Sequence, residues 1–402
     1  MLSRLRLITA GESHGPKLTA LLEGLPAGLR VDRDAMAALL ARRQRGFGAG
    51  GRMKIETDRG VITAGVPDGR TSGGPIAIEV PNRDWQNWQD REVAPMTRPR
   101  PGHADLVGAQ KYGYDDLRFA LERASARETA ARVAAGALCL QVLRELGIEV
   151  GGHVRQLGAA HAGLDDPGGD AAAEATWRAR VAAAADDEMA AIDPACSARY
   201  RAEVKRAIAA RDTLGGVLEV VALGLPPGLG SFVAWDRRLD ARIAFAMASI
   251  PAMKGVELGD GFVNAGKLGS EVHDAIVAEH GTLRRPTNRC GGLEGGVSTG
   301  APLVVRVAMK PIATTLVGLP TVDLATGEAG DTVYERSDIC AVPRALPIAE
   351  AMLGLVLCDA LLEKLGGDSM AELRARVATL PRDRIADVPM RAEPWRFAYE
   401  EV

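Results

Sequence analysis

A chain of 402 residues can form one large domain or two to three domains of ordinary size. Apolar residues make up 47% of it and aromatic residues only 4%, which predicts a globular protein whose helices pack on small side chains. The formal net charge of −3 argues against general affinity for nucleic acid, so any anion site has to be a local cluster of arginines.

The cysteines and the apolar runs indicate the cellular compartment. The five cysteines are odd in number, widely spaced and without a C-x-x-C pair, which predicts reduced thiols in a cytosolic protein. The N-terminal residues contain no apolar run long enough for a signal peptide. No run reaches about 18 apolar residues, so we expect no membrane span.

A glycine-rich loop interrupts the first predicted strands. Residues 4–9 alternate as a strand does, and 18–22 resume that pattern. Between them, glycines at both ends of 11–15 allow a sharp turn that leaves His14 free to project. A single histidine in such a loop is weak evidence for function, although its titration near neutral pH makes it a common acid or base.

A basic segment follows the first predicted helix. Asp32 is a suitable N-cap for a helix that continues to about Gln44. Basic side chains in the last turn and the glycine loop after it either complement the helix dipole or form a clamp for phosphate or carboxylate, and the sequence leaves both interpretations open. These side chains are Arg42, Arg43, Arg45, Arg52 and Lys54.

Residues 53–65 and 76–80 are predicted to be strands, because they are rich in β-branched residues or alternate. Residues 82–92 contain Trp85 and Trp88 among polar neighbours. That segment is interpreted as either a surface excursion or a contact between subunits.

Residues 98–136 concentrate polar chemistry. Two prolines at 99 and 101 stiffen the approach to His103. Ser125 and Glu128 fit the capping box S-x-x-E of a helix that continues to about Leu146. The amides at its start would favour a phosphate or carboxylate, although the same pattern is also found at ordinary helix caps.

The second half repeats the order of elements of the first: strand, glycine turn, strand and long helix. Strands are predicted at 216–223 and 303–309, and Asp236 is predicted to cap a helix that Pro251 terminates. The apolar segment 347–367 is predicted to be a core helix. Residues 155–212, with a helix at 197–211, are interpreted as a surface insertion without chemistry, where His153 and His161 are structural or solvated, and the residues after Leu380 as a peripheral tail. The glycine-rich loop 287–300 would let amides approach a ligand, but it matches no nucleotide-binding motif.

These motifs, in this order, resemble those of the chorismate synthase family across residues 7–360. The resemblance implies an α/β (α+β) fold: a single-domain β-α-β sandwich over residues 1–402, with central helices between outer antiparallel sheets and with internal pseudo-symmetry. It also implies a cytoplasmic homotetramer. The segments that carry it are 11–15, the surroundings of Arg43 and Arg52, 98–105, 122–129, 259–262, 291–300, Lys310 with Pro311, and 336–338.

The resemblance implies an activity: anti-1,4-elimination of phosphate from 5-enolpyruvylshikimate 3-phosphate, which gives chorismate and requires reduced FMN. By this match, His14 protonates the leaving phosphate, and His103 protonates the reduced flavin or holds its charge. Asp338, with Ser125, positions or relays the proton removed at flavin N5.

The same match assigns contacts. Those to FMN are Arg123, Ala124, Ser125, Pro251, Ala252, Gly295, Lys310, Pro311, Ile312, Ala313, Thr314 and Arg336. Those to the substrate or to NADPH, a possible reductant of the flavin, are Ser13, Arg43, Arg45, Arg52 and Arg127. Two positions depart from the family pattern: Ala49, where an arginine is frequent, and Pro251, where a polar residue is common.

Three other classes of protein are considered. A flavin-dependent oxidoreductase that consumes NADPH would share the flavin contacts, but the chain has no separate dinucleotide motif. A non-catalytic phosphate- or flavin-binding protein would not need two histidines in constrained loops. A metal enzyme is disfavoured because His14 and His103 have no local carboxylate or thiol at ligand spacing, so no metal is expected.

Overall fold

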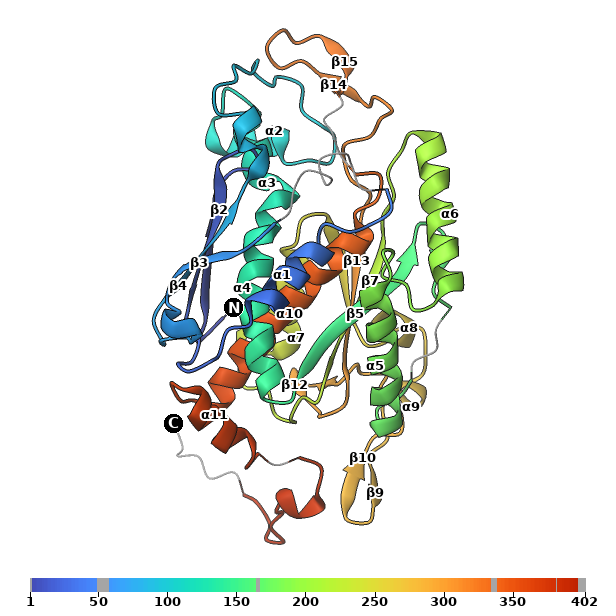
Figure 1. The fold of residues 1–402 in the computed structure, drawn as a ribbon. Coiled ribbons are helices and arrows are strands. Elements are labelled where there is room, and N and C mark those ends of the chain that lie inside the picture. Colours follow the sequence, from blue (N-terminus) through green and yellow to red (C-terminus); the bar gives the residue numbers. More distant parts are fainter. Residues whose placement is uncertain (1, 49–57, 164–166, 334–337, 381, 397–402) are drawn as a thin grey trace, which may run out of the picture.

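The computed structural model describes residues 2–48, 58–163, 167–333, 338–380 and 382–396 (Figure 1). Its two main sheets are antiparallel throughout. The first has the order β1 (Arg6–Ala10), β2 (Lys17–Glu23), β4 (Ile76–Pro81), β3 (Val61–Ala64). The second has the order β6 (Ala160–His161), β5 (Glu149–Leu157), β7 (Gly216–Leu223), β13 (Leu303–Met309), β8 (Met253–Leu258).

Helices fill the space between the two sheets. Helix α4 (Thr129–Glu145) packs on β2 and β4, and α10 (Val342–Leu365) packs on α4, β5 and β7. Helices α1 (Arg33–Arg42) and α7 (Leu239–Ala248) complete this layer. Each half of the chain therefore supplies one sheet and one long helix, and the predicted α/β sandwich is confirmed.

The alternation of side chains explains the first sheet. Leu18, Ala20 and Leu22 of β2 are buried, whereas Leu21 is 41% exposed. This period of two is that of a strand with one face on the core. One hydrophobic core joins residues of both sheets and the helices between them, which supports the prediction of a single domain.

The two long helices approach closely because small residues line their contact. A Cβ on Gly136 of α4 would lie 2.6 Å from the Cβ of Ala351 on α10, and a Cβ on Gly354 would lie 2.5 Å from Leu140. Any larger side chain would therefore force the helices apart. Helix α10 is long and apolar enough to cross a membrane, but its most apolar stretch is entirely buried in the protein.

The interpretation of 155–212 as a surface insertion needs correction. Residues 155–157 belong to β5, and helix α5 (Ala171–Asp186) packs against that strand. Trp177 of α5 is buried with Val221 and Val304, and Tyr200 of α6 (Pro194–Ala210) is also fully buried. These helices therefore cover the second sheet, which explains why β7 and β13 are buried on both faces.

Three predicted helix boundaries are also corrected. Asp32 caps α1 as predicted, by accepting the amide of Ala35. Ser125 caps a 3-10 turn, η4 (Ala126–Glu128), and Glu128 binds Arg132 one turn later, so no capping box forms. Helix α7 starts at Leu239 without Asp236 as its cap, and α10 begins at Val342, five residues before the predicted start.

Shorter elements connect this framework. The helical segments are η2 (Pro67–Gly69), η3 (Arg83–Asn87), α2 (Asp105–Tyr112), α3 (Arg118–Ala124), η5 (Trp235–Arg237), α8 (Gly261–Asn264), α9 (Gly269–Val272), α11 (Met370–Val377) and η6 (Ile385–Asp387). Three small hairpins pair β9 (Val277–Glu279) with β10 (Thr282–Arg284), β11 (Leu293–Glu294) with β12 (Val297–Ser298), and β14 (Pro320–Val322) with β15 (Ala329–Asp331). Helices α2 and α3 lie at the upper end of Figure 1, and β9, β10 and α11 lie at the lower end.

A ladder of polar side chains crosses the second sheet. His153, Glu219 and Arg306 stand opposite one another on β5, β7 and β13. Glu219 accepts hydrogen bonds from Arg306 Nε (2.6 Å) and Arg155 Nη1 (3.0 Å), and it lies 3.3 Å from His153 Nε2. Burial and the positive charges of the surrounding arginines lower the pKa of His153 to about 4. The negative charge of Glu219 offsets this lowering only in part. The imidazole is therefore neutral near pH 7.

This buried neutral histidine predicts acid sensitivity. Histidine in an unfolded chain titrates near pH 6.5, so between about pH 6.5 and 4 the unfolded chain binds a proton at His153 that the folded chain excludes. The free energy of unfolding should fall as the pH falls through that window, by up to about 3 kcal/mol from this group. Urea unfolding at pH 7, 6, 5 and 4 measures it. His153→Gln should lose less stability than wild type, and parallel curves would contradict the prediction.

Candidate active site

The loop between β1 and β2 presents His14. Gly11 has φ +109°, and a Cβ there would lie 2.6 Å from the carbonyl oxygen of Lys17, so this turn requires glycine. Glu122 of α3 accepts hydrogen bonds from the His14 ring at Nδ1 (2.7 Å) and from the His14 amide (2.8 Å). Burial would raise the pKa of Glu122, but the hydrogen bonds from His14 and the nearby Arg118 hold it below its ordinary value.

Ser13 and Ser125 meet beside this histidine. Their hydroxyl oxygens are 3.0 Å apart, and Ser13 is buried. The Ser13 amide donates to the carbonyl of Glu122 (3.1 Å), which ties the loop to the end of α3. Ser125 also accepts the amide of Arg127 (3.3 Å). Three predicted site residues, Ser13, His14 and Ser125, are therefore brought together.

The second histidine has a carboxylate of its own. His103 Nδ1 lies 2.6 Å from Oδ1 of Asp105, the fully buried first residue of α2. Arg100 Nε donates to the other oxygen of Asp105 (2.7 Å). Burial would raise the pKa of Asp105, but the hydrogen bonds from His103 and Arg100 hold it far below its usual range. An ionised carboxylate only accepts hydrogen bonds, so Nδ1 carries a proton in both histidines. Nε2 is the ring nitrogen that the carboxylate does not bind.

The predicted flavin segment 310–314 lies against the His103 loop. Lys310 Nζ donates to the carbonyl of Gly102, and Arg100 Nη1 donates to Thr314 (3.2 Å). The Lys310 amide donates to the carbonyl of Ala252 (3.0 Å), whose φ of +68° is uncommon for a residue with a side chain. Burial, together with Lys254, lowers the pKa of Lys310. The intervening residues Pro311, Ile312 and Ala313, and Pro251 beside Ala252, are exposed or partly exposed.

Polar contacts also connect the end of α3 to α7. Arg123 donates to the carbonyl of Thr9 (2.9 Å), and Ala124 is the last residue of α3. Thr9 in turn donates to Glu128 (2.6 Å), which binds Arg132 (2.9 Å). Arg132 donates to Ser249 Oγ (2.9 Å), two positions before Pro251.

The predicted anion-binding arginines are buried and paired. Arg43 and Arg127 both bind Asp58, and Arg43 Nη2 also donates to the carbonyl of Ala126 (2.7 Å). Asp338 pairs with Arg344, whose Nε donates to the carbonyl of Arg43 (2.9 Å). Asp338 is thus connected to the start of α4 through Arg344 and Arg43.

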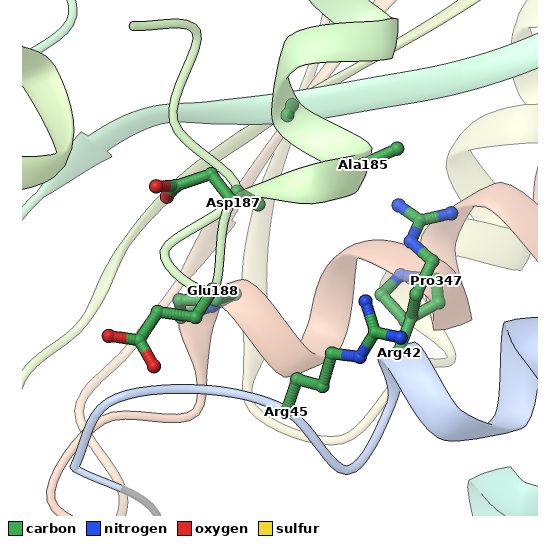
Figure 2. A pocket seen from close by; sticks show the side chains of 9 residues that line it. Arg42, Arg45, Ala185, Asp187, Glu188 and Pro347 are labelled. Carbon is green, nitrogen blue, oxygen red and sulfur yellow. The ribbon is translucent and has the colours of Figure 1, made fainter. Parts of the chain in front are cut away.

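Some predicted site residues lie elsewhere. Arg45 lines a small surface pocket with Arg42 on one side and Asp187 and Glu188 on the other, as Figure 2 shows. Gly295 is in the β11–β12 hairpin, which contacts the start of α7. Ala252 lies just after the end of α7, and Lys310 binds Ala252 there. Ten helical residues, about 15 Å, separate the two positions. Arg52, Arg336 and Ala49 fall outside the described residues.

Sequence reasoning assigned no role to Glu122, Asp105 or Trp88. Glu122 and Asp105 belong to the segments 122–129 and 98–105, which carry the family resemblance. Their position in these segments was the signal that could have identified them. Trp88 packs on the His14 ring with ring centroids 4.0 Å apart, so the segment 82–88 packs against the loop that carries His14.

Two imidazoles held by carboxylates, with serine, lysine and arginine side chains nearby, are the residue types that enzymes use for general acid–base catalysis on anionic small molecules. The sequence profile of the chorismate synthase family matches residues 5–362. Chorismate synthases of Thermobifida fusca and Leifsonia xyli subsp. xyli are 54% and 52% identical to this chain over 384 residues, which cover 92% of it and 96% and 93% of those proteins. A crystal structure of chorismate synthase is 41% identical with a TM-score of 0.77, covering 94% of this chain and 97% of that one.

The chain therefore belongs to the chorismate synthase family, whose members are lyases of the shikimate pathway.

Proposed function

We propose that this chain eliminates phosphate from 5-enolpyruvylshikimate 3-phosphate to form chorismate, with reduced FMN as cofactor. The observation that carries the proposal is the pair of histidine–carboxylate contacts, His14 with Glu122 and His103 with Asp105, in a chain of this family. In this 1,4-elimination, a carbon–oxygen bond breaks, phosphate leaves with the electron pair, and a proton leaves the other end of the system, so the net redox state is unchanged.

In this proposal, His14 supplies the proton. Its Nδ1–H is engaged with Glu122, so the proton for the leaving phosphate comes from Nε2 of the protonated ring. The Ser13–Ser125 contact lies beside it and can hold or relay a proton. Asp338 is connected to the start of α4 through Arg344 and Arg43, which supports a positioning role for it.

The residues around His103 fit FMN. Lys310 and Thr314 offer cationic and hydroxyl donors at this loop, and Arg123 offers a guanidinium beside Thr9, which suit the phosphate and ring oxygens of a flavin. Reduced FMN, when bound, supplies an electron-rich ring that the elimination requires. His103 would hold or donate a proton beside that ring, because its Nδ1 is fixed by Asp105. The contact residues proposed for FMN are those that the family resemblance assigns, and within one protomer α7 separates Gly295 from Lys310.

The finer properties are proposed on the same basis. Net charge and the burial of α10 support a cytoplasmic enzyme without a nucleic-acid or membrane partner. Large exposed apolar side chains such as Trp235, Phe245 and Phe262 support self-association into a homotetramer. NADPH is a possible reductant of the flavin.

Anaerobic assay with photoreduced FMN and 5-enolpyruvylshikimate 3-phosphate tests the proposal. Phosphate and chorismate should appear in equal amounts, and none should appear with oxidised FMN. If no phosphate is released with reduced FMN, the proposal is wrong. Aerobic oxidation of NADPH in the presence of FMN would show in a separate experiment whether the protein reduces its own flavin.

A further inference from the structure

We propose that Glu122 and Trp88 are positioning residues for His14, which lock the ring so that Nε2 is the nitrogen that faces the substrate. This inference rests on the proposed function, in which His14 protonates the leaving phosphate. Neither residue is a proton donor in that reaction, and both act through His14.

One carboxylate fixes both the backbone and the ring of His14. Oε2 of Glu122 accepts the His14 amide (2.8 Å), and Oε1 accepts Nδ1 of the same residue (2.7 Å). Only 15% of the Glu122 side chain and 19% of the His14 side chain are exposed. Rotation of the ring would therefore break a charge-assisted hydrogen bond in a mostly dry environment.

The indole of Trp88 restricts the tilt of the His14 ring. Its ring lies against the imidazole with centroids 4.0 Å apart and an angle of 34° between the planes. Trp88 Nε1–H donates to buried Asp84 (3.0 Å), which holds the indole in place. Asn82 of the same segment donates its side-chain amide to the carbonyl of Gly15 (2.8 Å), so this segment also holds the loop that carries His14.

The arrangement has a chemical consequence for the tautomer. Because Glu122 is ionised, it accepts a hydrogen bond from Nδ1–H, and this bond holds the neutral ring as the Nδ1–H tautomer. After His14 has given up its Nε2 proton, this form presents an unprotonated Nε2 on the side away from Glu122. A second proton on Nε2 then restores the acid without any movement of the ring. His103 has the same Nδ1–carboxylate arrangement with Asp105.

Two substitutions separate the geometry from the charge. Glu122→Gln keeps the size of the side chain and an oxygen acceptor but removes the charge, whereas Glu122→Leu removes both. Trp88→Phe keeps an aromatic ring beside His14 but removes the Nε1–H that binds Asp84, together with part of the stacked ring area. Glu145→Gln is the matched control, because Glu145 forms an ion pair with Arg374 on α11. In the part of the chain that the structure describes, Glu145 makes no contact with the His14 loop.

The first measurement needs neither substrate nor flavin. Nitrogen-15 NMR of histidine-labelled protein, with His14→Gln to assign the signals, reports which ring nitrogen carries the proton in the neutral ring. We expect Nδ1–H for His14 in the wild type and in Glu122→Gln, and loss of that preference in Glu122→Leu. An Nε2–H tautomer in the wild type would overturn the proposal.

The second measurement is steady-state release of phosphate with reduced FMN. Loss of a residue that orients a catalytic group should lower kcat with little change in KM. We expect kcat to fall about 10-fold in Glu122→Gln and about 100-fold in Glu122→Leu, to fall less in Trp88→Phe, and to stay unchanged in Glu145→Gln. Wild-type kcat in Glu122→Leu would overturn the proposal. If the wild type releases no phosphate, the proposed function fails, whereas the tautomer still tests the pairing of Glu122 with His14.

Discussion

His14→Ala should lower the rate of chorismate formation about 100-fold or more, because removal of a general acid forfeits that factor. His103→Ala should cause a loss of similar size, for a different reason: it empties the position between Asp105 and the 310–314 segment where a proton or positive charge is held. Anaerobic stopped-flow measurement of chorismate absorbance, with reduced FMN in excess, gives the single-turnover rate of each variant.

The design separates chemistry from folding. His161→Ala is the matched control, since His161 is an exposed histidine on the short edge strand β6 and should leave the rate unchanged. Far-ultraviolet circular dichroism and the urea midpoint confirm that each variant is folded. A near-wild-type rate in His14→Ala would remove His14 from the mechanism, and the same result in His103→Ala would remove His103.

Four strands of the two main sheets and the start of α1 followed from local patterns. β2, β4, β7 and β13 fall within a residue or two of their predicted bounds, because alternation and β-branched residues are local properties. Helix α1 begins where Asp32 predicts it, for the same reason. The 3-10 turn at 126–128 was not predictable from the S-x-x-E pattern, since Glu128 has a stronger partner in Arg132 and Thr9.

The partners within the site depend on distant contacts. Glu122 binds a histidine 108 positions away, and Thr314 binds Arg100 from 214 positions away. No periodicity encodes such pairs, so the sequence indicated His14 but not the carboxylate that holds it. Asp105, by contrast, lies only two positions from His103, so that partner was local and was overlooked. The burial of Trp177 in 155–212 was missed for a similar reason: an alanine-rich helix looks solvated until the sheet it covers is known.

The N-terminal segment is anchored to the core by one carboxylate, Asp359 of α10. This fully buried side chain accepts the amides of Ser3 (2.9 Å), Arg4 (2.8 Å) and Leu5 (2.7 Å). It also pairs with the guanidinium of buried Arg242 on α7. These contacts end immediately before β1, the strand that leads to the loop of His14.

Asp359→Ala should therefore destabilise the protein by about 3–5 kcal/mol, because it leaves three amides without their acceptor and a buried guanidinium with Glu363 as its remaining carboxylate partner. The urea midpoint at pH 7 measures this loss. Asp387→Ala is the control: it breaks the surface pair with Arg384, which water screens, and should cost much less than Asp359→Ala. In Asp359→Ala combined with Arg242→Leu, part of the stability should return, because the buried charge that has lost one of its two carboxylate partners is gone, while the amides of 3–5 remain unsatisfied. A loss in Asp359→Ala no larger than that in Asp387→Ala would show that α10 does not anchor β1, and the His14 loop would then have to be held by Glu122 and the segment 82–88 alone.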